Sequence, residues 1–144
     1  MPARDRYHDH VVRALIADGW VITHDPLHLP FGGRDTFVDL GAERVVSADK
    51  GGRKIAVEIK SFLGASPVRD LEQALGQFVL YAELLGEVEP ERVLYLAVSD
   101  TARLELFDEP IGQLLLRHGR LKLLVFDPKK EVITQWIPEI TTEV

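Results

Sequence analysis

The chain has 144 residues, 46% of them hydrophobic, which is sufficient to bury the core of one ordinary globular domain over residues 1–144. A formal net charge of −6 argues against a protein that coats nucleic acid nonspecifically. The lack of cysteine excludes disulfides and thiolate metal sites. The sequence also shows no apolar run of membrane-spanning length and no secretory leader, and these features together predict a cytoplasmic protein without membrane contact.

The chain begins with a predicted helix. Residues 6–18 place apolar side chains at helical spacing, and Gly19 is positioned to end the helix. Residues 20–23 then form a short strand. Residues 27–35 contain one proline and two glycines, so this segment is predicted to be a loop.

A hairpin follows this loop. Residues 36–40 and 44–48 are extended and read as one strand with an irregularity at Gly41. Residues 49–52 supply a hairpin turn, and residues 53–61 return as the second strand. This hairpin carries the residues that point most directly to a chemical function.

The second half of the chain predicts two helices and three strands. Ser66 as N-cap and Pro67 at the first helical position open a helix that runs to about Leu85 and ends at Gly86. The later elements are a buried strand at 93–99, a helix from 110 to 118, and a hairpin of strands 121–127 and 131–137. The order α-β-β-β-α-β-α-β-β predicts an α/β fold with a mixed sheet flanked by helices.

The segment around Glu58 combines a strand pattern with charged side chains. Alternation over I-A-V-E-I-K puts one apolar set on one face and Ala56, Glu58 and Lys60 on the other. Asp39 lies one hairpin earlier and could supply a second carboxylate. Two carboxylates beside an ammonium group are suited to holding Mg²⁺ or Mn²⁺ against a phosphodiester. A half-exposed strand can also show charges at i and i+2 without any function.

The predicted long helix carries a polar row. Gln73, Gln77 and Tyr81 are spaced by four residues and therefore share one face. The predicted core face consists of Val68, Leu71, Leu75, Phe78 and Leu85. The polar row could steady Lys60 and a phosphate, or it could be the ordinary polar flank of a helix.

Charge is distributed unevenly along the chain. Between residues 44 and 69 there are six basic and two acidic side chains, although the whole chain is acidic. A local basic stretch suits a contact with a polyanion such as DNA. A solvated hairpin with lysines at its tip explains the same charges equally well.

Taken together, these motifs resemble a known family. The ordered combination of Asp39, Glu58-x-Lys60 and the Gln77-x-x-x-Tyr81 helix is similar to the PD-(D/E)XK nuclease superfamily. The whole chain resembles the XisH family, the fdxN-element excision controlling factors, in five stretches: residues 18–27, 38–43, 54–62, 70–81 and 92–98.

The resemblance implies a restriction-endonuclease-like fold with an α-β-β-β-α-β core, a C-terminal helix and a β-hairpin. It implies that Asp39 and Glu58 bind the metal and that Lys60 is catalytic, with Gln77 and Tyr81 on the catalytic helix. Asp9 would take the metal-binding place of the first-helix acid, although its side chain is shorter than the usual glutamate.

The resemblance also implies a role in site-specific excision of a DNA element, together with DNA, a small XisI-like partner and a separate recombinase. A homodimer would be natural for an enzyme that cuts both strands. Two functions remain open at this point: a Mg²⁺- or Mn²⁺-dependent DNA endonuclease, and a non-cutting accessory that docks DNA, the XisI-like protein and the recombinase.

Overall fold

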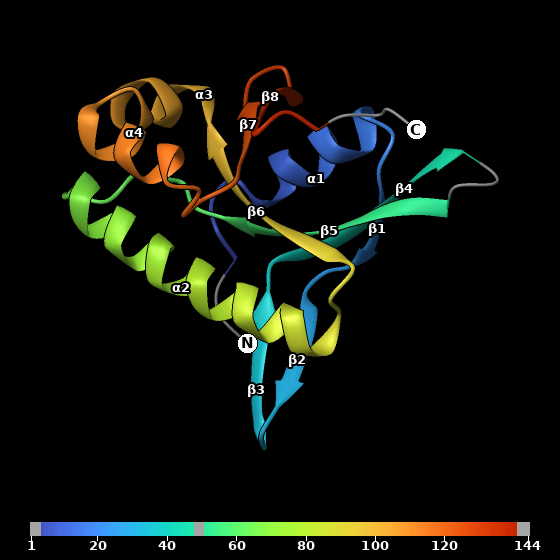
Figure 1. Cartoon of the computed structure of the whole chain (residues 1–144). Coiled ribbons are helices and arrows are strands. Elements are labelled where there is room, and N and C mark those ends of the chain that lie inside the picture. Colours follow the sequence, from blue (N-terminus) through green and yellow to red (C-terminus); the bar gives the residue numbers. More distant parts are fainter. Residues whose placement is uncertain (1–3, 48–50, 141–144) are drawn as a thin grey trace.

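The structure, a computed structural model, describes residues 4–47 and 51–140. A mixed six-stranded sheet in the order β1-β4-β5-β6-β7-β8 forms its centre, with helices on both faces (Figure 1). The pairs β5–β6 and β6–β7 are parallel, and the other pairs are antiparallel. The predicted α/β class with a mixed sheet and flanking helices is therefore confirmed. No helix in the described ranges is long and apolar enough to cross a membrane.

The first helix, α1 (His8–Ala17), covers one face of the sheet. Gly19, at φ 94°, accepts the left-handed conformation that closes the helix, and its N–H donates to the Ile16 carbonyl. Val11, Ala14 and Leu15 of α1 pack against the side chains of Ile55, Val57 and Ile59. The predicted end of the helix at Gly19 is confirmed. The prediction that Ile55, Val57 and Ile59 share one face of their strand is also confirmed.

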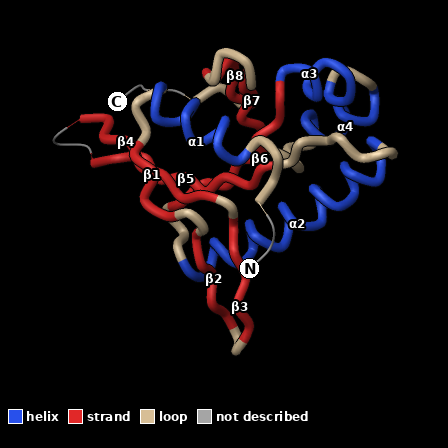
Figure 2. Tube along the Cα trace, turned by 180° about the vertical axis from the view of Figure 1, so that it is seen from behind, coloured by secondary structure: helices blue, strands red, loops and turns tan. Residues whose placement is uncertain are grey.

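The second face of the sheet is covered by α2 (Pro67–Val88), as Figure 2 shows from behind. The Ser66 hydroxyl accepts a hydrogen bond from the Arg69 N–H at 3.2 Å, so the predicted N-cap is confirmed. The predicted end at Gly86 is wrong, because the helix continues to Val88. It stops where Pro90 disfavours helical geometry at the preceding residue.

The predicted core face of α2 is partly correct. Leu71, Phe78 and Leu85 are buried and Leu75 is half-buried, but Val68 is 47% exposed. Val68 lies in the first turn of α2, before the helix reaches the sheet. It is therefore left on the surface beside the segment that follows β6.

The loop predicted for residues 27–35 is wrong. Strands β2 (Leu27–Phe31) and β3 (Arg34–Val38) pair antiparallel as a separate hairpin that projects from the body of the molecule (Figures 1 and 2). Gly32 and Gly33, both at positive φ, form its two-residue turn. The alternation of buried Leu27 and Leu29 with exposed neighbours was the strand signal, and the proline and glycines obscured it.

The single strand predicted over 36–48 is interrupted at Asp39, two residues before the predicted irregularity at Gly41, where the pairing with residues 22–24 also shifts register. Asp39 forms a bend between β3 and β4 (Leu40–Ser47), where the chain leaves the small hairpin and enters the large sheet. Strand β1 (Val21–His24) pairs with β4, and β5 (Gly51–Ile59) pairs with its other edge. Residue 48, the end of the predicted strand 44–48, and residues 49 and 50 of the predicted turn lie outside the described residues.

The remainder of the chain extends the sheet. Strand β6 (Arg92–Ser99) leads into α3 (Asp100–Ala102), a π-helix η1 (Arg103–Phe107) and α4 (Pro110–Arg117). Strands β7 (Leu123–Asp127) and β8 (Val132–Ile137) complete the sheet as the predicted hairpin.

The segment η1 was not predicted. Its Phe107 carbonyl accepts a hydrogen bond from the side chain of Gln113 on α4 at 2.6 Å. Gly112 lets α4 approach the π-helix closely, because a Cβ there would lie 2.5 Å from the Leu106 carbonyl oxygen. The π-helix η1 is thus stabilised by its contact with α4. Local sequence periodicity does not predict such a contact between separate segments.

Candidate active site beside the end of β5

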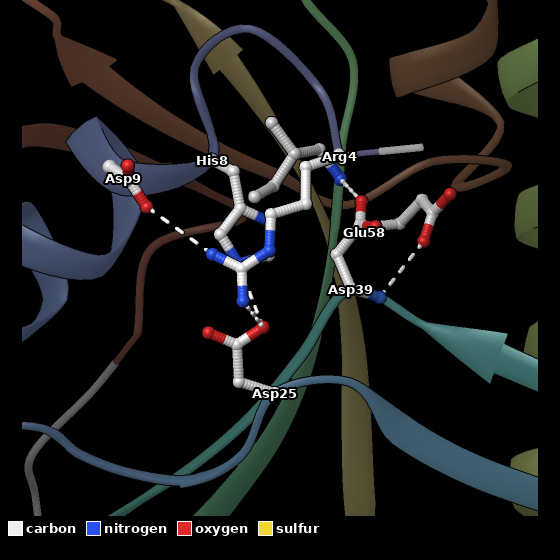
Figure 3. Close-up of polar contacts among 7 residues, drawn as sticks. Arg4, His8, Asp9, Asp25, Asp39 and Glu58 are labelled. Carbon is white, nitrogen blue, oxygen red and sulfur yellow. Dashed lines mark hydrogen bonds and ion pairs between the residues drawn. The ribbon is translucent and has the colours of Figure 1, made fainter. Parts of the chain in front are cut away.

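Asp39 and Glu58 meet where the small hairpin joins the large sheet (Figure 3). The register of β4 with β5 pairs Leu40 with Val57, which brings the bend at Asp39 beside Glu58. The Asp39 N–H donates to Glu58 Oε1 at 3.3 Å, and the Ile59 N–H donates to Asp39 Oδ2 at 2.7 Å. These two hydrogen bonds fix both carboxyl groups against the backbone of the neighbouring segment.

The pair is buried, and burial changes its protonation. Glu58 is only 8% exposed, and this burial, together with the nearby charge of Asp39, raises the pKa of the Glu58 carboxyl to about 8. Burial also raises the pKa of Asp39, although the Ile59 N–H and the charge of His8 oppose that rise. Near neutral pH the two groups therefore retain a proton that ordinary carboxyl groups would have released.

Lys60 follows Glu58 by two residues and lies against α2. Its Nζ donates to Gln73 Oε1 at 3.2 Å and lies 3.9 Å from Asp70 Oδ1. Asp70 also accepts a hydrogen bond from the Gly64 N–H at 3.1 Å, so it connects the loop after β5 to the helix. The structure thus brings Lys60 and Gln73 together and adds Asp70, which sequence reasoning did not identify.

Tyr81 and Gln77 occupy different environments on α2. Tyr81 is half-buried, and burial raises the pKa of its hydroxyl, with further contributions from the charges of Glu58 and Asp39. Tyr81 is therefore within electrostatic reach of the acid pair. Gln77 is exposed, and among the described residues its side chain makes no hydrogen bond.

Asp9 does not contact the acid pair. Its carboxylate is exposed and lies 3.5 Å from the Arg4 guanidinium, as Figure 3 shows. The N-terminal residues whose charges act on Asp39 are His8 and Asp5. The metal role predicted for Asp9 stays a prediction, and the structure offers two other residues near the pair.

His8 and Asp5 were missed by sequence reasoning. His8 is 3% exposed, and its Nε2 lies 2.8 Å from Asp25 Oδ1. Asp5 accepts hydrogen bonds from the Tyr7 N–H at 2.9 Å and from the Ser61 N–H at 3.0 Å. Asp5 therefore ties the start of α1 to the chain just beyond Lys60. An acidic residue ahead of a helix is a recognisable signal, but nothing local indicated its partner at Ser61.

The donor set bears on which cation the site can hold. Within residues 4–47 and 51–140, no group of three or more His, Asp or Glu side chains is arranged to hold a metal ion. Two carboxylates remain, Asp39 and Glu58. Mg²⁺ commonly binds through one or two carboxylates while retaining several waters, so this pair fits such an ion and does not form an all-protein cage.

Comparisons with known proteins agree with the fold. The family model described as "XisH protein" matches residues 1–134. The crystal structure of an XisH family protein from Nostoc punctiforme PCC 73102 is 42% identical, with a TM-score of 0.83, and the match covers 92% of this chain and 99% of that chain. The crystal structure of an fdxN element excision controlling factor protein from Anabaena variabilis is 44% identical, with a TM-score of 0.83, covering 93% and 99%. No curated protein matches the chain.

Proposed function

Because the chain belongs to the XisH family, we propose that it acts in the controlled excision of a DNA element, as a metal-dependent DNA endonuclease. The observation that carries the proposal is the buried pair of Asp39 and Glu58, in which the Glu58 pKa is about 8. Two buried carboxyl groups forced together destabilise a fold unless a proton or a cation lies between them. Such an arrangement is typical of a site built for a cation.

In the proposed site, Asp39 and Glu58 would hold Mg²⁺ or Mn²⁺. When bound, this ion neutralises phosphate charge and lowers the pKa of an attacking water. Lys60, which donates a hydrogen bond to Gln73, would orient that water or stabilise developing negative charge. The Ile59 N–H, which donates to Asp39, restrains that carboxylate in one orientation.

We assign the fold to the restriction-endonuclease-like group within the PD-(D/E)XK superfamily. The support is the antiparallel β4–β5 pair, the parallel β5–β6 pair and the crossing by α2 between them. In this assignment Asp39 and Glu58 would bind the metal and Lys60 would be the catalytic lysine. We expect duplex DNA as substrate and a homodimer for cutting both strands.

A second candidate function is a non-catalytic accessory that docks DNA, an XisI-like protein and a recombinase. The net charge of −6 favours the protein-docking part of this role, since the chain carries no overall attraction for DNA. The ion pair of Lys60 with Asp70 favours it as well, because a lysine already paired is less available to a substrate.

The experiment that separates the two functions measures Mg²⁺ and Mn²⁺ binding by calorimetry and nicking of supercoiled DNA on the same samples. The variants are Glu58→Ala and, as a matched control, Asp35→Asn, which alters an exposed carboxylate on the β2–β3 hairpin. Binding and nicking should both disappear in Glu58→Ala and persist in Asp35→Asn. Cation binding without nicking, even with partners added, would favour the accessory. No cation binding by the wild type would overturn the metal site.

A further inference from the structure

A small apolar cavity lies between the start of α2 and the π-helix η1. Its volume is about 200 Å³, room for one large apolar side chain. The lining residues are Phe62, Pro67, Val68, Ala102, Glu105, Leu106 and Glu109. None of these belongs to the acid pair or to the polar row of α2.

The apolar part of this cavity is preformed. Phe62 adopts a φ of 55°, a conformation that a bulky residue rarely takes, and packs edge-to-face on Phe107 with ring centroids 5.8 Å apart. Leu106 and Ala102 are buried beneath the cavity, whereas Val68 remains 47% exposed at its rim. The structure thus combines an unusual backbone conformation with an open apolar hollow at one position.

The rim of the cavity is acidic. Glu105 and Glu109 are both exposed, and in the described part of the chain neither carboxylate makes an ion pair or a hydrogen bond. An apolar hollow beside two unpaired carboxylates is complementary to an apolar side chain flanked by basic residues. It is not complementary to DNA, whose phosphates these carboxylates would repel.

We propose that this cavity, which we name the α2–η1 pocket, docks a segment of a partner protein that presents a large apolar side chain next to lysine or arginine. The occupant would contact Phe62, two residues after Lys60, so the docking site adjoins the proposed catalytic lysine without sharing its residues. The inference does not depend on DNA cleavage, since the pocket is separate from Asp39 and Glu58.

The test is a selection of short random peptides displayed on phage against the immobilised full chain. The expected consensus is a leucine, isoleucine, methionine or aromatic residue flanked by lysine or arginine. Selected peptides, made synthetically and labelled, are then titrated against the wild type, two pocket variants and two control variants. Val68→Lys places a positive charge at the rim, where it repels the basic residues of the occupant and removes apolar surface, and should weaken binding by about tenfold or more. The double variant Glu105→Gln and Glu109→Gln should weaken binding and reduce its dependence on salt.

Leu104→Lys is the matched control, because Leu104 is 64% exposed on the same π-helix but lines a different cavity, with Arg103 and Asp108. It should bind the peptides like the wild type, and so should Glu58→Gln, which leaves the pocket intact. Thermal melting should be unchanged in Val68→Lys, because the replaced side chain is at the surface. An acidic consensus, no enrichment, or equal binding by Val68→Lys would overturn the proposal.

Discussion

The Asp39 N–H donates to the Glu58 carboxylate, and the Asp39 carboxylate in turn accepts from the N–H of the residue after Glu58. This reciprocal arrangement joins the bend between β3 and β4 to the end of β5. It holds two buried carboxyl groups together although their mutual repulsion opposes ionisation of both. The predictions below follow from this arrangement and from the residues around it.

The first prediction concerns stability and pH. Because the pKa of folded Glu58 is about 8 against an ordinary value of 4.5, the folded state retains a proton that the unfolded chain has released between these pH values. Stability of the wild type should therefore fall as pH rises through this window. Glu58→Gln should be more stable than the wild type at pH 9 by about 3 kcal/mol, and by much less at pH 5.

Urea denaturation at several pH values, without divalent cations, measures this difference. Glu72→Gln on the exposed side of α2 is the control and should follow the wild type throughout. If the difference in unfolding free energy between wild type and Glu58→Gln stays constant from pH 5 to pH 9, the pKa of Glu58 is not raised in the folded state.

The second prediction concerns cation binding. A divalent cation between Asp39 and Glu58 must displace the proton that the pair retains at neutral pH, so binding should release about one proton at pH 7 and fewer at pH 9. Calorimetry in buffers of different ionisation heat measures the number released. In Asp39→Asn binding itself should be lost. A heat that is independent of the buffer would show that the cation binds elsewhere.

The third prediction separates two glutamines on α2. Gln73 accepts a hydrogen bond from Lys60, whereas the Gln77 side chain makes none among the described residues. If the chain nicks DNA, Lys60→Met should reduce the rate by about a hundredfold or more. Gln73→Ala should reduce it several-fold by loosening Lys60, and Gln77→Ala should change it least. Single-turnover rates with saturating Mn²⁺ measure the order, and a larger loss in Gln77→Ala than in Gln73→Ala would contradict it.

The fourth prediction compares two neighbours on α1. His8 is buried against Asp25 and near Asp39, so His8→Ala removes packing and leaves Asp25 with only the Arg4 guanidinium, 3.5 Å away. It should destabilise the chain by about 2–3 kcal/mol. Asp9 is exposed, so Asp9→Ala should change stability by less than about 0.5 kcal/mol and should retain cation binding. Denaturation and calorimetry on both variants test this, and loss of cation binding in Asp9→Ala would restore its predicted metal role.

Sequence reasoning succeeded where the signal was local. The alternation over residues 54–60 correctly placed Glu58 on the opposite face from Ile55, Val57 and Ile59, because side-chain direction in a strand has a period of two. Ser66 and Pro67 correctly marked the start of α2, since capping depends on adjacent residues. The combination of motifs was also sufficient to indicate the family.

The sequence by itself therefore determined the α/β class, the strand that carries Glu58 and the helix that faces Lys60. Only the tertiary structure decided that Asp39 lies at a bend beside Glu58, that Asp70 and Gln73 hold Lys60, and that His8 and Asp5 approach the pair while Asp9 does not. Strand register and helix packing set these contacts, and both depend on residues far apart in the chain. A periodic pattern records which face a side chain takes, but it does not record which distant side chain shares that face.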